Sequence, residues 1–242
     1  MKTSSYGSHL LQLTRLPRMF PVNCYLVRED DGFTLIDTAL GGSADAILHI
    51  AQQQGAPIVR IALTHAHGDH VGSLDALHKK LPDAEVLISA RDARFLAGDR
   101  SLDPGEPQTK PRGGYKTCAT RPTRLLSAGD RVGSLEVVAT PGHTPGHIAF
   151  FDHRDRALIV GDAFQTRGDV AVSGTVVPLF PFPALATWHK PTALQSAIAL
   201  RALEPALLTV GHGAMLRDPL AAMDRAIQVA RSKTSVAQQQ RG

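Results

Sequence analysis

The stretch "LTHAHGDHVG", residues 63–72, places three histidines and one aspartate within six positions. Its first two residues end an apolar run, residues 59–64, that we predict to be a β-strand because it is rich in β-branched and aliphatic side chains. A loop that begins at the end of a rigid strand can turn several side chains towards one point. The stretch is therefore either a polar loop that happens to be rich in histidine or part of a metal centre.

The spacing within the stretch favours a metal centre. His65 and His67 are two positions apart, so both point to the same side of an extended segment. Gly68 then allows the backbone to turn before Asp69 and His70. One short segment can thus offer two nitrogens to one ion, and an oxygen and a nitrogen to a second ion.

Other parts of the chain repeat the same order of apolar strand, small residue and metal-ligand side chain. The segments are "VVATPGHTPGH", "ALIVGDAF" and "ALLTVGHG". Three residues follow apolar runs in this way: His143 after residues 135–140, Asp162 after residues 157–160, and His212 after residues 206–210. Four strand ends that each supply a ligand are hard to obtain by chance, so we predict that they meet at one site.

The composition is that of an ordinary globular protein, with 242 residues, of which 43% are hydrophobic and 20% charged. No apolar run approaches the roughly 18 residues that cross a bilayer, and the N-terminus lacks the apolar core of a secretory signal. We therefore predict a cytoplasmic protein without a membrane partner.

The formal charge is +4, the basic residues are scattered, and no nucleic-acid motif accompanies them, so we expect no nucleic-acid partner. Cys24 and Cys118 share no metal or redox spacing and are predicted to be free thiols.

The predicted elements indicate one α/β domain over residues 1–242. We expect strands at residues 10–16, 22–28, 33–37, 59–64, 85–89, 135–140, 148–152, 157–160 and 206–210. We expect helices at residues 43–54, 72–81, 192–203 and 219–232. Each half of the chain has strands first and a helix afterwards, which indicates two packed sheets with helices outside.

Two segments are expected to lack regular structure. Residues 98–122 are rich in proline, glycine and basic residues, and almost free of aliphatic ones. Loops of that length are either functional lids or disordered segments, and we predict a mobile loop. The end of the chain, residues 233–242, is predicted to be a frayed tail.

The HxHxDH motif at residues 65–70, followed in order by His143, Asp162 and His212, resembles the metallo-β-lactamase superfamily over about residues 10–230. That resemblance implies a four-layer αβ/βα sandwich of two mixed sheets, with the site at the sheet edges. It also implies a ligand set: His65, His67 and His143 for a first metal, Asp69, His70 and His212 for a second, and Asp162 as the bridge between them. His147 competes with His143 for the third position, but the "TPGH" turn favours His143, which leaves His147 in a supporting role.

Imidazole and carboxylate ligands suit zinc, and also iron or manganese. Two divalent ions would provide a hydroxide at neutral pH and act as Lewis acids on the reacting carbonyl. Asp69 and Asp162 are the predicted catalytic carboxylates. Asp69 would orient the nucleophile and pass a proton to the leaving group, and Asp162 would hold the two ions together.

Departures from the subfamilies favour hydrolysis of a carboxylic ester, lactone or thioester. β-Lactamases with this motif generally lack the bridging aspartate, so β-lactam hydrolysis would be a minor activity. Glyoxalase II-like enzymes add a C-terminal helical domain, and only about 30 residues follow His212 here. Lactonases of this family usually place a tyrosine three residues after the bridging aspartate, where this chain has Gln165. Ribonuclease Z-like enzymes share the ligands, but no RNA-binding insertion is recognisable.

A proline-rich insert, residues 166–188, contains "VVPLFPFPALATW" and is expected near the site. Its aromatic residues either pack in the core or form the wall of an apolar pocket for a small-molecule substrate. The candidates for substrate binding are Phe20, Phe164, Phe180, Phe182, Trp188 and His189.

Two other classes of function stay open at this point. One is a mononuclear iron oxygenase acting on a persulfide, which would use His65, His67 and His143 and leave the second set idle. The other is a binding module without catalysis, against which the complete ligand set argues. The oligomeric state, including a homodimer, is also left open by the sequence.

Overall fold

The first half of the chain forms a seven-stranded sheet in which the strands follow one another in chain order. Its strands are β1 (Lys2–Tyr6), β2 (Leu10–Arg15), β3 (Val22–Glu29), β4 (Gly32–Ile36), β5 (Ile58–Ala62), β6 (Glu85–Ser89) and β7 (Arg124–Leu126). Strands β1 to β4 are antiparallel and joined by short turns, whereas β4 to β7 are parallel. The parallel pairs need crossover connections, and helices supply them.

The second half forms a six-stranded sheet in the order β15-β14-β11-β10-β9-β8. Its strands are β8 (Arg131–Val132), β9 (Leu135–Ala139), β10 (Ile148–Asp152), β11 (Ala157–Ile159), β14 (Leu207–Thr209) and β15 (Leu216–Arg217). A separate two-stranded ribbon consists of β12 (Phe164–Gln165) and β13 (Ala171–Val172). The computed structural model describes residues 1–239, with side chains described as far as Lys233.

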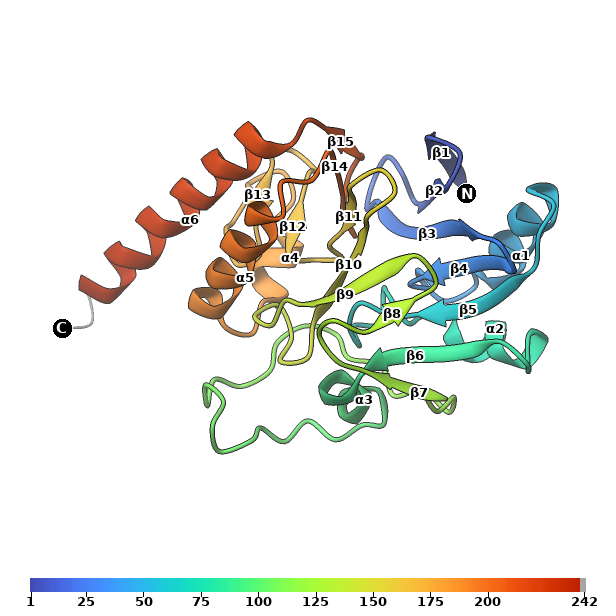
Figure 1. Ribbon diagram of the computed structural model, residues 1–242. Coiled ribbons are helices and arrows are strands. Elements are labelled where there is room, and N and C mark those ends of the chain that lie inside the picture. The colour runs from blue at the N-terminus through green and yellow to red at the C-terminus, as the bar shows by residue number, and fades with distance from the viewer. Residues whose placement is uncertain (240–242) are drawn as a thin grey trace.

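Helices cover the outer face of each sheet (Figure 1). They are α1 (Ala44–Gln53), α2 (Leu74–Lys80), α3 (Ala90–Leu96), α5 (Lys190–Ala202) and α6 (Leu220–Gln239). A further short helix, α4 (Phe182–Ala186), precedes α5. One apolar cluster joins the first sheet to α1, α2 and α3, and another joins the second sheet to α5 and α6. A third cluster, which includes Tyr25, Ile36, Phe150 and Ile159, lies between the two sheets. These apolar clusters make a four-layer αβ/βα sandwich, which confirms the predicted fold class.

Several short elements were missed by the sequence patterns. The strand β1 has an alternating polar sequence, and α3 and α4 are too short for a clear helical period. The predicted end of the last helix at residue 232 was wrong, because α6 continues to Gln239 through the beginning of the expected frayed tail. The remainder of that expected tail, residues 240–242, lies outside the described residues.

The predicted loop at residues 98–122 contains no strand or helix, only an isolated bridge between His67 and Tyr115. It is nevertheless fastened to the fold, because Arg91 pairs with Glu106 at 2.6 Å and Cys118 is buried in the first core cluster. Its mobility stays a prediction. No helix within residues 1–239 has both the length and the apolar character needed to span a membrane.

The two sheets bring the predicted ligands to one edge. Strands β9 and β11 are both antiparallel to β10, and β14 is parallel to β11, so β9, β11 and β14 run in one direction. Their carboxyl ends therefore meet at the same edge of the second sheet. Residues 63–70 follow β5 of the first sheet and complete the site from the opposite side.

Candidate metal centre

The first predicted ligand set forms a tight, buried triangle of imidazole nitrogens. His65 Nε2 lies 3.1 Å from His67 Nδ1, and His67 Nδ1 lies 3.0 Å from His143 Nε2. All three side chains are buried. The structure therefore brings together three residues that are up to 78 positions apart in the chain.

The outer nitrogens of two of these rings identify the tautomers. His67 Nε2–H donates to the carbonyl of Arg112 at 2.9 Å, because a carbonyl can only accept. The hydroxyl of Thr64 donates to Asp37 at 2.8 Å, so its oxygen is free to accept from His65 Nδ1–H at 2.9 Å. The inner nitrogens, His65 Nε2 and His67 Nδ1, consequently carry lone pairs.

The third ring is held by a chain of hydroxyl groups. Thr187 donates to the carbonyl of Pro183 at 2.7 Å, which leaves its oxygen to accept from Ser173 at 2.8 Å. Ser173 in turn accepts from His143 Nδ1–H at 2.9 Å. Three lone pairs then face one another about 3 Å apart with no proton between them. Such an arrangement is unfavourable unless a cation binds there.

The second set lies beside the first and shares Asp162 with it. Asp162 Oδ2 is 3.3 Å from both His143 Nε2 and His212 Nε2, and Asp162 Oδ1 is 3.3 Å from His70 Nε2. Asp69 Oδ2 completes the set at 3.3 Å from His212 Nε2. The ligand atoms of Asp69, His70 and His212 lie within 4.8 Å of one another. A carboxylate that lies within 3.3 Å of nitrogens from both ligand sets is the arrangement expected of a bridging group.

Two buried atoms at this point have no hydrogen-bond partner, His70 Nε2 and Asp162 Oδ1. Buried polar groups are almost always satisfied, so the pair indicates a missing bonded atom. Gly211 leaves the space for the carboxylate, because a side-chain carbon at that position would meet Asp162 Oδ1 at 2.1 Å. The residues present therefore fit a pair of divalent cations.

The protonation states agree with that fit. Burial lowers the pKa of His65, His67 and His143, so these rings are neutral and ready to bind a metal. Burial disfavours the protonated form of His212. The nearby carboxylate of Asp162 favours that form more strongly, and it raises the pKa of His212 to about 10. A proton held there occupies the place that a metal ion would take.

A residue that the sequence patterns did not single out supports both sets. Asp37 Oδ2 accepts from His70 Nδ1 at 2.8 Å, and Asp37 Oδ1 accepts from the amide of Thr64 at 2.8 Å. Asp37 directly follows β4 and has a positive φ of 60°, which turns its side chain back towards the site. It obeys the same strand-then-ligand order as Asp162, and that order could have identified it.

A second buried carboxylate, Asp92 in α3, joins the two ligand-bearing loops. Its Oδ2 accepts from the amide of Ala66 at 2.9 Å and from the hydroxyl of Thr144 at 2.8 Å. Its Oδ1 accepts from the amide of Gly146 at 2.8 Å. Burial raises the pKa of Asp92 to about 6. Because the sequence patterns did not predict α3, Asp92 could not have been placed beside these loops.

His147 lies beside the cluster, and its two nitrogens are both used by the protein. Its Nε2 accepts from the amide of Asp162 at 3.2 Å, and its Nδ1 lies 2.7 Å from the hydroxyl of Thr140. Burial lowers the pKa of His147 to about 3, so the ring is neutral. The structure therefore gives His147 the position of a support for Asp162, and the ligand triangle contains His143.

A cavity of about 290 Å³ opens onto the ligands. Asp69, Asp162 and His212 form its polar side, and Phe20 and Phe182 belong to its apolar side. Phe180 packs behind them, with its ring centroid 5.2 Å from that of Phe20 and 5.3 Å from that of His212. These three phenylalanines thus lie next to the ligands, where the sequence analysis expected them.

The other three candidates for substrate binding lie elsewhere. Phe164 is completely buried in the core between the second sheet and its helices, so it packs rather than faces a pocket. Trp188 and His189 line a different cavity from the ligands. Trp188 is buried and donates its indole N–H to the carbonyl of Thr109 at 2.6 Å, and His189 caps α5. Both residues stay beside the His143 loop, because their backbone amides donate to the carbonyls of His143 and Gly142 at 2.9 Å, but neither lines the metal pocket as predicted.

The model of the metallo-beta-lactamase superfamily matches residues 17–212. An uncharacterized protein of Bacillus subtilis (strain 168), YobT, is 53% identical over 232 residues, or 96% of this chain and 99% of that protein. YflN, a probable metallo-hydrolase of the same organism, is 31% identical over 79% of this chain and 80% of its own length. A hydroxyacylglutathione hydrolase of Xanthomonas euvesicatoria pv. vesicatoria (strain 85-10) is 32% identical over 59% of this chain and 46% of its own length.

Solved structures show the same architecture. TTHA1623, crystallised in a di-iron-bound form, superposes with a TM-score of 0.63 at 29% identity, covering 87% of this chain and 96% of that one. DIM-1 metallo-beta-lactamase superposes with a TM-score of 0.72 over 96% and 97% of the two chains, but at 15% identity it shows the fold alone. The prediction of a metal-dependent hydrolase is confirmed at the level of the family. The chain belongs to the metallo-β-lactamase superfamily.

Proposed function

We propose that the protein is a binuclear hydrolase, with zinc as its metal, that acts on a small carboxylic ester, lactone or thioester with an apolar acyl part. The observation that carries the proposal is the position of Asp162. Its two oxygens face both ligand sets at 3.3 Å, and the same residue lines a cavity with an apolar wall. A site of this kind combines a place for two cations with a place for an apolar substrate group.

Two bound divalent cations would supply Lewis acidity and a hydroxide at neutral pH. The protein's own contribution is to hold the ligands rigidly and to handle a proton. Asp69 is suited to transferring a proton, because its side chain is 24% exposed and lines the cavity, whereas Asp162 is buried. Its carboxylate can accept a proton from the nucleophile and deliver it to the leaving group.

The apolar wall supports the choice of an acyl substrate. Phe182 and Leu185 of α4 both line the cavity, and they are 52% and 59% exposed. Phe20 joins them from the loop between β2 and β3, with its ring centroid 5.1 Å from that of Phe182. Exposed apolar side chains next to a buried polar cluster are typical of a surface that a ligand covers.

The relatives support parts of this proposal. The hydroxyacylglutathione hydrolase, matched over 46% of its length, supports a thioester, and the probable metallo-hydrolase supports hydrolysis in general. The di-iron form of TTHA1623 supports iron as the alternative metal. A mononuclear oxygenase is less favoured, because Asp69, His70 and His212 form a second complete ligand group.

The test combines metal analysis with a substrate panel. Elemental analysis of the purified protein should find two equivalents of metal, and hydrolysis should appear with esters, lactones or thioesters before β-lactams. One equivalent of iron together with oxygen consumption on a persulfide would instead show the oxygenase.

The acyl preference is tested by Phe182→Ala. Loss of a buried contact to the substrate should raise KM for an octanoyl ester roughly 10-fold and leave an acetyl ester little changed. Leu179→Ala is the matched control, because Leu179 is 84% exposed and does not line the metal cavity. Equal losses for both esters would show that Phe182 does not contact the acyl group.

A further inference from the structure

A second cavity of about 580 Å³ lies next to the metal pocket, on the outer side of His143. It is enclosed by residues 109–112, by residues 173–176 after β13, by the start of α5 and by the end of α6. The walls of the two cavities are adjacent in sequence, since Gly113 and Ala186 line the metal pocket whereas Arg112 and Thr187 line this one. The two spaces share no lining residue.

The lining of the second cavity is strongly basic. Arg112, Lys190 and Lys233 all line it, and no aspartate or glutamate does. Within the part of the chain that the structure describes, no ion pair or side-chain hydrogen bond engages any of these three cations. Unpaired cations around one hollow repel each other and create a positive potential that an anion relieves.

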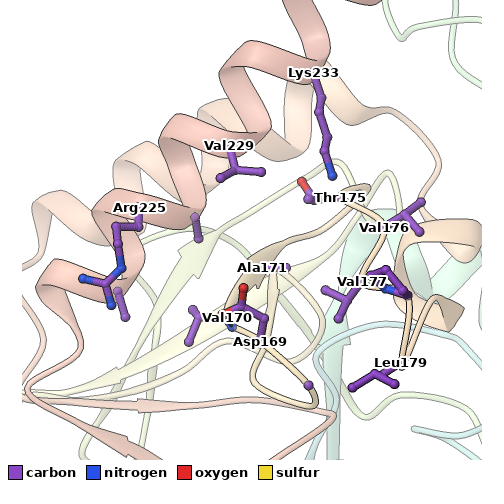
Figure 2. Close-up of a pocket in the computed structure, with 14 residues that line it drawn as sticks. Asp169, Val170, Ala171, Thr175, Val176, Val177, Leu179, Arg225, Val229 and Lys233 are labelled. Carbon is purple, nitrogen blue, oxygen red and sulfur yellow. Dashed lines mark hydrogen bonds between the residues drawn. The ribbon is translucent and has the colours of Figure 1, made fainter.

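Lys233 lines this cavity and also a neighbouring hollow of about 590 Å³, which Figure 2 shows. Figure 2 shows its side chain extending from α6 towards the segment that carries Thr175 and Val176. Arg225, two turns earlier on the same helix, lies at the far end of the neighbouring hollow. Arg225 thus lines the neighbouring hollow but not the second cavity, whereas Lys233 lines both.

The rest of the lining adds hydroxyl and apolar groups. Ser173 and Thr187, the hydroxyl pair that holds His143 Nδ1, face the cavity together with Thr109 and Thr175. Trp188 lines it as well, and so do Val176 and Pro191. Cations and hydroxyls suit the oxygens of a carboxylate or phosphate, and the indole and aliphatic groups suit an apolar or aromatic body.

We propose that this cavity is a binding site for a small organic anion that carries a carboxylate or phosphate group on an apolar body. The ligand's charged group pairs with Arg112, Lys190 and Lys233, and its body packs beside Trp188. The site is separate from the metal cavity and does not depend on the reaction proposed there.

The protein contains its own probe, because Trp188 is its only tryptophan. Phenyl phosphate and benzoate are titrated into the metal-loaded protein while the fluorescence of Trp188 is followed, and inorganic phosphate and benzyl alcohol are titrated in parallel. We expect a saturable change with phenyl phosphate or benzoate, a weaker effect of inorganic phosphate, and none with benzyl alcohol. The tighter of the two aromatic ligands identifies the preferred anionic group, and added salt should weaken its binding.

The double variant Lys190→Ala/Lys233→Ala assigns the binding to this cavity. Removing two charged contacts should weaken the binding of the tighter ligand by at least roughly 10-fold. Arg225→Ala is the control and should bind within about 2-fold of wild type, since it removes a positive charge from α6 at the neighbouring hollow and leaves the second cavity intact. Melting temperatures of all variants should be unchanged, because these side chains are exposed.

Three results would overturn the proposal. One is the absence of a saturable change in wild type at about 10 mM ligand, a concentration that detects even weak anion sites. Another is undiminished affinity in the double variant, which would place the anion on the metal ions instead. The third is equally tight binding of benzyl alcohol, which would show a neutral apolar pocket.

Discussion

The two ligand sets differ in what supports them. In the first set, the outer nitrogens of His67 and His143 bond only to neutral groups, a carbonyl and a hydroxyl. In the second set, the outer nitrogen of His70 bonds directly to the carboxylate of Asp37. A carboxylate behind an imidazole makes its inner nitrogen a stronger metal ligand than a neutral group does. His212, the other imidazole of the second set, has a neutral support, because its Nδ1–H donates to the carbonyl of Pro21 at 2.7 Å. The difference between the two sets is thus the carboxylate behind His70.

The largest loss of metal and of turnover is expected from a substitution of Asp162, the residue that both ligand sets share. Asp162→Ala removes the negative charge shared by both sets and leaves the repulsion between two dications less compensated. The variant should hold fewer than two metals, and kcat should fall by at least roughly 10²-fold, the scale for a positioned electrostatic group. Metal stoichiometry and turnover beside wild type measure this.

The control for that experiment is His147→Ala, which removes the acceptor of the Asp162 amide and the partner of the Thr140 hydroxyl but no predicted metal ligand. Its losses in metal content and rate should be milder. If Asp162→Ala kept two tightly bound metals and near-normal turnover, Asp162 would be a turn residue and the two sets would be independent.

The second-largest effect is expected from Asp37→Asn, which tests the role of the carboxylate behind His70. Asp37→Asn leaves an amide where His70 Nδ1–H and the Thr64 hydroxyl both need an acceptor. We expect metal affinity of the second set to fall 10- to 100-fold. The first set should lose less, because Asp37 reaches His65 only through Thr64. Competition with a chromophoric chelator resolves the two affinities, and an equal loss in both sets would contradict the difference drawn here.

A third effect is expected from Asp92→Asn, because Asp92 bonds to both loops that carry ligands. Asp92→Asn places a side-chain N–H opposite one of the three groups that donate to Asp92. It should lower the free energy of unfolding by about 1–3 kcal/mol. Because burial raises the pKa of Asp92 from 3.8 to about 6, the folded state binds this proton more tightly than the unfolded state does. Its contribution to stability is therefore complete below about pH 4 and is lost as the pH rises through 6.

Denaturant unfolding of the metal-free wild type and Asp92→Asn measures that contribution. The difference in stability between them should be larger at pH 4.5 than at pH 7. A difference that does not change with pH would mean that Asp92 titrates normally in the folded protein.

The smallest effect is expected from Ser173→Ala. It removes a neutral acceptor of His143 Nδ1–H, while the Thr187 hydroxyl remains 3.3 Å away. Metal affinity of the first set should fall by no more than about 10-fold, the lower end of the range for such supports. A larger loss than in Asp37→Asn would reverse the comparison of the two sets.

The ligands and the fold class were predictable from the sequence because both follow from short-range patterns. A strand that ends in a small residue and a histidine or aspartate is visible within about ten residues, as in "ALLTVGHG". The order of strands and helices in each half indicated two sheets with outer helices, and the fold has that arrangement. The resemblance to a known family then assigned the residues to two sets, and the structure brings the members of each set together.

Tertiary structure alone decided which aromatic and acidic residues serve the site. Phe182 and Trp188 lie six positions apart in one proline-rich insert, yet they line different cavities because α4 begins at Phe182 and ends at Ala186, before Trp188. Asp92 reaches both ligand loops from a helix too short to show a period. The second cavity gathers Arg112, Lys190 and Lys233 from three segments distant in sequence. Contacts of this kind depend on how elements pack across the layers, and no local pattern of side chains encodes that.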